Sequence, residues 1–194
     1  MIKIVFATNN KNKIKEVQKL LPTNIELIGL KDIGCEDDIP ETQHTIKGNS
    51  IQKVNYINSK YNLDCFADDT GLEISALNGD PGVLSARYAG SERNSKKNIE
   101  KVLKNLNNIK NRNARFKTVI ALSHKGGILT FEGVCEGVIS NEIQGDGGFG
   151  YDPIFKPKGI NKTFAELSFD EKNKISHRAI AIKKLIDYFN KLKS

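Results

Sequence analysis

The chain has no tryptophan, one methionine, three cysteines and five prolines among its 194 residues. Cys35, Cys65 and Cys135 lie far apart and form no CxxC pair, which argues against a thiolate zinc site or a dithiol redox motif. We expect three reduced thiols, as in a cytoplasmic protein. No internal repeat and no Pro- or Gly-rich linker divides the sequence, so residues 1–194 are expected to form a single domain.

Long apolar runs are also missing. One of the longest, residues 2–7, includes a lysine and is far too short to cross a bilayer. Met1 leads directly into strand-like residues, without a basic region followed by an apolar one. We therefore expect no signal peptide, no membrane partner and a cytoplasmic location.

The net charge of +7 suggests nucleic-acid binding, but the charge is unevenly distributed. Residues 31–82 hold four basic and ten acidic residues, a local charge of −6, whereas residues 91–117 hold nine basic and two acidic residues, a local charge of +7. Carboxylates between basic flanks fit a metal site beside cations that bind phosphates, although most of the lysines are better explained as a solvated surface. A nucleic-acid-binding module stays an alternative, and it predicts steeply salt-dependent binding.

Hydrophobic periodicity predicts an α/β protein with a mixed sheet and flanking helices. Strands are expected at 3–8, 65–67, 72–77, 116–123, 128–134 and 137–143, with a hairpin turn at 125–127. Helices are expected at 14–21, 46–58, 99–106 and 179–189, with Asn94 or Ser95 as a cap of the third. Ser168 and Glu171 match a capping box before a further short helix.

Two adjacent carboxylates, Asp68 and Asp69, follow the short strand at 65–67 and are expected at its end. Neighbouring side chains of a strand point to opposite faces, so the two are not expected to share a proton as a dyad. One would face a site and the other would brace it. A carboxylate next to a hydroxyl and a glycine suits Mg²⁺ or the orientation of a water, but for this dipeptide alone a solvated turn is the simpler interpretation.

The turn at 8–13, Thr-Asn-Asn-Lys-Asn-Lys, joins a strand to a helix. Backbone N–H groups at a helix N-terminus bind anions, and Lys11 and Lys13 add positive charge there. The turn lacks the glycines and the GK[ST] end of a Walker A loop. From this turn alone, phosphate binding and an ordinary turn without a ligand are both open interpretations.

The loop at 145–150 matches G-x-G-x-x-G, but Tyr151-Asp152-Pro153 follows it instead of a helix, so we reject a dinucleotide-binding fold. Phe149 and Tyr151 could pack in the core or stack on a base. Further along, Lys172, His177 and Arg178 fall at the start of the final helix, where they could face one anion or carbonyl ligand or form a surface network of ion pairs.

Taken together, these segments strongly resemble one family, the inosine/xanthosine triphosphate pyrophosphatases. The matching stretches run in the family's order: Phe6-Ala-Thr-Asn-Asn-Lys-Asn-Lys13, Ala67-Asp-Asp-Thr-Gly-Leu-Glu73, Leu77-Asn-Gly-Asp-Pro-Gly82, Ser85-Ala-Arg-Tyr88, Gly147-Gly-Phe-Gly-Tyr-Asp-Pro153, Ala165-Glu-Leu167 and Glu171-Lys-Asn-Lys-Ile-Ser-His-Arg178. They extend over nearly the whole chain.

The resemblance implies an elongated mixed sheet with flanking helices, folded as two lobes around a central cleft. It implies Mg²⁺-dependent hydrolysis of dITP, ITP and XTP to the monophosphate and pyrophosphate, and a homodimer. It also assigns roles to single residues. The triphosphate would be held by Thr8, Asn9, Asn10, Lys11, Asn12, Lys13 and Lys53. Mg²⁺ would be held by Glu41 and Asp69; Asp69 would also be the base for the attacking water, with Asp68 in support.

The resemblance places the nucleoside as well. Thr70 and, more weakly, Arg87 would contact the nucleotide. Phe149 would stack on the base, beside Gly150, Tyr151 and Asp152. The base edge would be read by Lys172, His177 and Arg178.

The chain departs from the family pattern at a few positions. Pro40-Glu41 stands where many bacterial members have two acids, so only Glu41 can serve there. Thr70 replaces a frequent serine and keeps the hydroxyl, whereas Leu84 replaces a frequent aromatic residue. A pyrophosphatase with a different base preference stays open as a second alternative.

Overall fold

The computed structural model describes residues 2–192. Its one six-stranded sheet has the order β2-β1-β3-β4-β5-β6. The strands are β1 (Ile2–Phe6), β2 (Ile25–Ile28), β3 (Cys65–Ile74), β4 (Asn113–His124), β5 (Gly127–Ile139) and β6 (Phe155–Pro157). The main helices are α1 (Lys11–Leu20), α2 (Ile46–Tyr61), α3 (Ser95–Asn105), α4 (Phe169–Ile175) and α5 (His177–Lys191). The predicted α/β class with a mixed sheet is confirmed, because β1 pairs in parallel with β2 and β3, whereas β5 pairs antiparallel with β6.

The chain forms two compact units. The first comprises residues 1–69, 118–133 and 178–194, and the second comprises residues 70–117 and 134–177.

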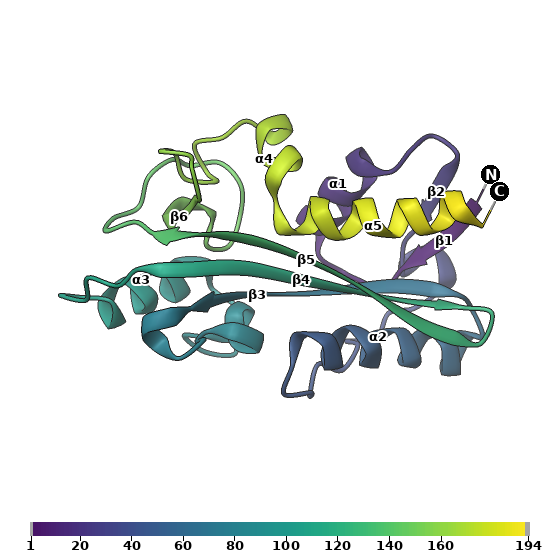
Figure 1. Ribbon diagram of the computed structural model, residues 1–194. Coiled ribbons are helices and arrows are strands. Elements are labelled where there is room, and N and C mark those ends of the chain that lie inside the picture. The colour runs from purple at the N-terminus through teal and green to yellow at the C-terminus, as the bar shows by residue number, and fades with distance from the viewer. Residues whose placement is uncertain (1, 193–194) are drawn as a thin grey trace. The chain divides into compact units, whose positions relative to one another are not determined.

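Alternation along β1 builds the two cores of the first unit. Ile4 and Phe6 join a cluster with residues of α1 and α5, whereas Val5 joins a cluster with residues of α2. Figure 1 accordingly shows α1 and α5 over one face of β1 and α2 over the other. Successive strand side chains point to opposite faces, so hydrophobic residues of β1 pack against helices on both faces of the sheet.

The second unit has its own core around Phe116, Phe155 and Phe164. The rings of Phe116 and Phe155 meet edge to face with centroids 4.7 Å apart. Apolar residues of α3 pack against this aromatic cluster, and Asn94 caps that helix by accepting a hydrogen bond from the Lys97 N–H, as one of the two predicted caps. Side chains 149–177 are therefore supported by a core separate from those of the first unit.

Two expectations about strand boundaries were wrong. The strands predicted at 65–67 and 72–77 are one strand, β3, so Asp68 and Asp69 lie in its middle and not at its end. Likewise β5 runs without a break to Ile139, and no separate strand covers 137–143. The predicted breaks followed polar residues and glycines, which β3 and β5 tolerate because both are central strands whose backbone is paired on each side over part of their length.

Candidate active site

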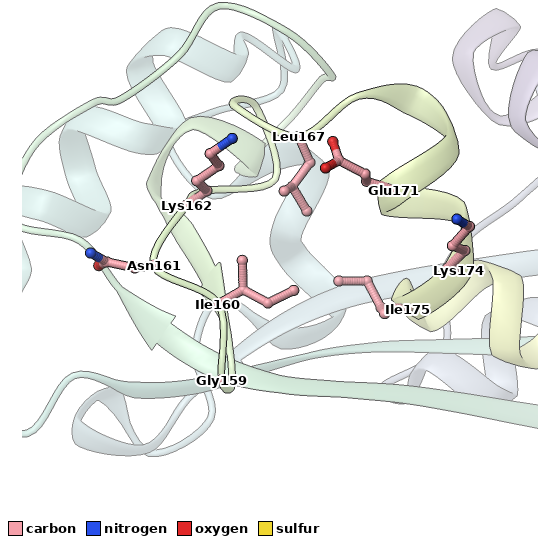
Figure 2. A pocket seen from close by; sticks show the side chains of 8 residues that line it. All are labelled: Gly159, Ile160, Asn161, Lys162, Leu167, Glu171, Lys174 and Ile175. Carbon is pink, nitrogen blue, oxygen red and sulfur yellow. The ribbon is translucent and has the colours of Figure 1, made fainter.

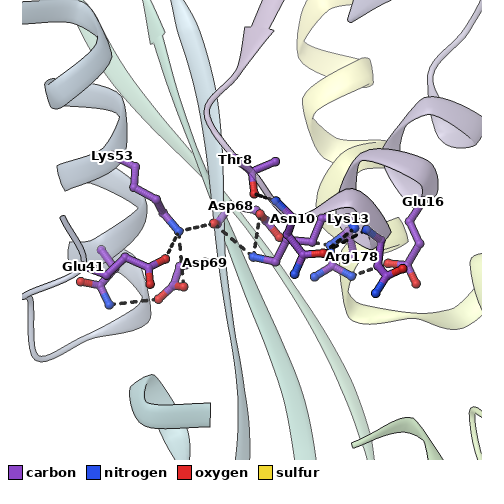
Figure 3. Close-up of polar contacts among 11 residues, drawn as sticks. Thr8, Asn10, Lys13, Glu16, Glu41, Lys53, Asp68, Asp69 and Arg178 are labelled. Atoms are coloured by element: carbon purple, nitrogen blue, oxygen red, sulfur yellow. Dashed lines mark hydrogen bonds and ion pairs between the residues drawn. The ribbon is translucent and has the colours of Figure 1, made fainter. Parts of the chain in front are cut away.

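The carboxylate pair of β3 separates into two environments, as alternation along a strand requires. Asp68 points toward α1 and α5, whereas Asp69 points toward α2 (Figure 3). Both side chains are buried, with 1% of Asp68 and 8% of Asp69 exposed. The expectation that the two do not form a shared-proton dyad agrees with these separate partners.

Asp68 is held by two cations. Its Oδ1 accepts a hydrogen bond from Lys13 Nζ at 2.9 Å, and its Oδ2 accepts one from Arg178 Nε at 3.1 Å. Arg178 Nη1 donates in turn to Glu16, a buried residue of α1. Burial alone raises the pKa of the Asp68 carboxyl, but the charges of Lys13, Arg178 and Lys53 outweigh burial and hold this pKa well below its usual range. Asp68 therefore stays ionised at neutral pH and holds Lys13 and Arg178 in position.

Asp69 belongs to a second cluster. Lys53 Nζ, from α2, lies 2.8 Å from Glu41 Oε1 and 3.5 Å from Asp69 Oδ1, and it donates to the backbone carbonyl of Asp68 at 2.7 Å. Asn49 Nδ2 donates to Asp69 Oδ2 at 3.3 Å. One ammonium thus lies where the carboxylates of Glu41 and Asp69 converge (Figure 3).

The pKa directions separate the two aspartates further. Burial raises the pKa of Asp69 above its ordinary value, and the charges of Glu41 and Asp68 add to this rise, although Lys53 and Lys13 oppose it. Burial lowers the pKa of Lys53, but Asp69, Glu41 and Asp68 outweigh it, so the pKa of Lys53 is raised. A carboxylate with a raised pKa accepts a proton more readily, which suits a general base.

The donor set around Asp69 fits Mg²⁺. Glu41 and Asp69 offer hard oxygen ligands that already converge on one positive charge, the Lys53 ammonium. Mg²⁺ in proteins commonly takes one or two carboxylates, with substrate phosphates and waters completing the shell. Within residues 2–192, no group of three or more His, Cys, Asp or Glu side chains is arranged to hold a metal by itself. Such a site would consequently depend on oxygens from a bound phosphate.

The turn at 8–13 joins β1 to the N-terminus of α1, which is the local structure predicted from the sequence. Asn10 caps α1: its Oδ1 accepts from the backbone N–H groups of Asn12 at 3.0 Å and of Lys13 at 3.2 Å. Thr8 Oγ1 accepts from the Asn10 N–H at 3.2 Å. Asn9, Lys11 and Asn12 are exposed, whereas Lys13 is turned inward to Asp68. The turn therefore presents a helix N-terminus with its capping side chains in place.

A second group of predicted residues lies in the second unit. Asp152 Oδ2 accepts from the Phe149 N–H at 2.8 Å and from Lys172 Nζ at 2.6 Å, and both Asp152 and Lys172 are buried. Lys172 Nζ lies 4.9 Å from the centroid of the half-buried Phe149 ring. Gly148, at φ +70°, admits this arrangement, because a Cβ there would overlap the Asp152 carboxylate. Asp152 thus fixes both the backbone of Phe149 and the ammonium beside its ring.

The remaining predicted residues have varied surroundings. His177 is buried, and its ring stacks on Phe116 with centroids 4.5 Å apart. Tyr151 is also buried, whereas Thr70, Arg87 and Gly150 are half-buried.

The expectation that Lys172, His177 and Arg178 lie together at the start of the final helix was wrong. Lys172 lies on α4 and the other two begin α5, because the chain is extended at Ser176 between them.

A shallow hollow of about 530 Å³ lies elsewhere in the second unit (Figure 2). Its walls combine apolar and charged side chains of α4 and of the segment that precedes it, namely Gly159, Ile160, Asn161, Lys162, Leu167, Glu171, Lys174 and Ile175. None of the predicted site residues lines it. We therefore place no part of the candidate chemistry there.

Sequence reasoning missed two residues of the first unit that belong to these clusters: Glu16 binds Arg178, and Asn49 donates to Asp69. Glu16 follows Lys13 by three positions on α1, and Asn49 precedes Lys53 by four positions on α2. Residues three or four apart share a helix face, so a search for polar residues at this spacing from the two lysines would have found both.

Comparisons with known proteins agree with the motifs. A sequence profile described as the Ham1 family matches residues 4–188. The dITP/XTP pyrophosphatase of Flavobacterium johnsoniae is 55% identical over 96% of this chain and 97% of its own length. That of Bacillus subtilis is 47% identical over 95% of this chain and 96% of its own length.

Solved structures agree as well. The Ham1 protein of Staphylococcus aureus superposes with a TM-score of 0.89 at 40% identity, covering 97% of this chain and 98% of that one. A HAM1 protein of Coxiella burnetii gives a TM-score of 0.90 at 40% identity, covering 98% of this chain and all of that one. The chain therefore belongs to the Ham1 family.

Proposed function

We propose that this protein hydrolyses dITP, ITP and XTP between the α- and β-phosphates, releasing a nucleoside monophosphate and pyrophosphate. The single observation that carries the proposal is the pair of ionic clusters on β3: Asp68 with its two cations lies on one face of the strand, and Asp69 with Lys53 lies on the other. The names of relatives at 55% and 47% identity, dITP/XTP pyrophosphatases, support the substrate class.

The phosphate chemistry belongs to the first unit. The N-terminus of α1 and the ammonium groups of Lys13 and Lys53 would bind the triphosphate and offset the charge that builds up on the leaving pyrophosphate. Asp68, fully ionised, keeps Lys13 in position for this role. Asp69, whose pKa is raised, would take the proton from the attacking water.

We propose Glu41 and Asp69 as the protein ligands of Mg²⁺. Their oxygens converge on Lys53 Nζ, so a cation and the ammonium would compete for or share the same carboxylates. Bound Mg²⁺ would neutralise phosphate charge and acidify a bound water. Glu41 and Asp69 would hold the ion, and Asp69 would accept the proton of the attacking water.

Base selection is proposed to depend on the second unit. Phe149 would stack on the purine, and the Lys172 ammonium, held by Asp152, would donate to an acceptor oxygen at position 6. Adenine has an amino donor at that position, so the buried donor would lose its partner, and mismatches of this kind discriminate by large factors. A role for His177 and Arg178 in reading the base stays a prediction.

The decisive experiment measures pyrophosphate and orthophosphate released from dITP, XTP, ITP, ATP and GTP, with Mg²⁺ and with EDTA. We expect pyrophosphate as the product, a requirement for the divalent cation, and kcat/KM for ITP well above that for ATP. Release of orthophosphate alone, or equal turnover of ATP and ITP, would contradict the proposal. A cytoplasmic homodimer is proposed with it, and light scattering would measure that oligomeric state.

Within residues 2–192, no helix is both long enough and apolar enough to span a bilayer.

A further inference from the structure

A buried hydrogen-bond node in the second unit joins three chain segments at one residue, Ser85. The Ser85 hydroxyl accepts from the Leu72 N–H of β3 at 2.8 Å and donates to the Gly82 carbonyl at 2.6 Å. The Ser85 carbonyl accepts from the Tyr151 hydroxyl at 2.8 Å and from Asn98 Nδ2 at 3.4 Å. Ser85 thereby connects β3, the loop that carries Phe149, and helix α3.

Asn98 is the residue that attaches this node to α3. Its Oδ1 accepts from the Ala89 N–H at 2.7 Å, and its Nδ2 also donates to the Ala86 carbonyl at 3.0 Å. Only 4% of Asn98 is exposed, so a polar atom of this side chain that lost its partner would be costly. One side chain therefore fixes the backbone of residues 85–89, which has no strand pairing of its own.

The node lies next to residues that the family resemblance assigns to the nucleotide. Thr70 is two residues before Leu72 on β3, and Arg87 is two residues after Ser85. Tyr151 belongs to the loop proposed to flank the base. Burial raises the pKa of the Tyr151 phenol, so its hydroxyl stays a donor at neutral pH.

We propose that Ser85 and Asn98, with the Tyr151 hydroxyl, are positioning residues for nucleoside binding: they set the relative placement of Thr70, Arg87 and the Phe149 loop. This inference rests on the proposed function, since it concerns affinity for the nucleoside part of the same substrates. The hydrogen bonds that form the node lie within the second unit, whereas the residues assigned to the phosphates belong to the first. Loosening it should therefore weaken nucleoside binding without changing phosphate binding.

Two nearly isosteric substitutions test the node. Tyr151→Phe removes one hydroxyl and keeps a ring that is only 4% exposed in the core. Asn98→Asp keeps the acceptor for Ala89 but turns an oxygen toward the carbonyls of Ser85 and Ala86. Tyr88→Phe is the matched control, because its hydroxyl bonds to the exposed Asn105 side chain outside the node.

The readouts are KM and kcat for dITP, the inhibition constant of inorganic tripolyphosphate, and the melting temperature. Loss of one buried hydrogen bond predicts a rise in KM of about fivefold for Tyr151→Phe. The Asn98→Asp variant should raise KM more. In both, kcat should stay within about twofold and the tripolyphosphate constant should not change. The double variant should be less than additive, because both substitutions act through the Ser85 carbonyl.

Wild-type KM in both folded variants would overturn the inference. So would a parallel loss of kcat and tripolyphosphate binding, which means general loosening, or an equal rise in KM in Tyr88→Phe. The proposed function fails separately, if the wild-type protein releases no pyrophosphate from dITP. In that case, calorimetric binding of dITP in EDTA replaces KM, and unchanged affinity in both variants overturns the node.

Discussion

Folding lowers the pKa of Asp68 and raises that of Asp69, so replacing each by asparagine should change the free energy of unfolding in opposite directions. Asp68→Asn removes the anion between Lys13 and Arg178, whose nitrogens lie 2.9 and 3.1 Å from its oxygens. At the effective dielectric that describes proteins best, each such pair is worth about 5 kcal/mol of attraction before desolvation. Asparagine avoids the energetic cost of burying a charged carboxylate and can keep weaker hydrogen bonds to the two cations. These two effects offset much of the lost attraction.

The net cost of Asp68→Asn should be about 3–5 kcal/mol in the free energy of unfolding, the usual result when one partner of a buried ion pair is removed. Asp69→Asn should be neutral or stabilising in EDTA, because the folded state disfavours the charged form of a carboxyl whose pKa is raised. Its turnover of dITP should nevertheless fall by orders of magnitude. Asp37→Asn, in an exposed pair with Lys60, is the control and should leave the unfolding midpoint nearly unchanged.

Urea unfolding, followed by circular dichroism at constant m, measures both effects. The pKa of Asp68 is lowered on folding, so its contribution is complete above its unfolded pKa of about 3.9 and is lost as the pH falls through the folded value. The cost of Asp68→Asn should thus be constant from pH 8 to pH 5 and shrink below. A cost under about 1 kcal/mol at pH 7, or equal costs for the two aspartates, would refute the separation into two environments.

Further predictions concern other parts of the chain. Glu41→Gln should raise the Mg²⁺ concentration needed for half-maximal turnover while the protein stays folded, as a titration with MgCl₂ will measure. Gly148→Ala should raise KM for dITP, since the new Cβ overlaps the Asp152 carboxylate; an unchanged KM would argue against this loop as the base wall. Burial raises the pKa of the Cys65 thiol to about 12, so Cys65 should not react with a thiol reagent at pH 8 until the chain is unfolded in urea.

Much of the fold could be predicted from the sequence, because most of its elements bury one clear face. The helix predicted at 99–106 follows an i, i+3, i+4 pattern and appears as α3, with a cap at one of the two residues named for it. The hairpin at Lys125-Gly126 was predicted equally well, since both residues adopt positive φ as a two-residue turn requires. Local chemistry was sufficient in these two cases.

The continuity of β3 could not be predicted in this way. Asp68, Asp69 and Gly71 are poor strand residues by propensity, so local preference predicts a break where the strand in fact continues. Tertiary partners override that preference, because Lys13, Lys53 and Arg178 compensate the buried carboxylates. Where a sequence breaks a local rule and the chain still folds through it, the compensating groups tend to mark a functional position.

Arg178 illustrates the same limit at the level of a single side chain. Its position in the sequence predicts a common site with Lys172 and His177, but its guanidinium binds Glu16 and Asp68. The pairing with Glu16 joins residues 162 positions apart, which spacing alone cannot indicate. If Arg178 also reads the base, Arg178→Lys should change the ratio of kcat/KM for ITP to that for ATP. If it acts only by holding Asp68 and Glu16, both values should fall together and the ratio should stay the same, because a lysine lacks the second nitrogen that reaches two carboxylates at once.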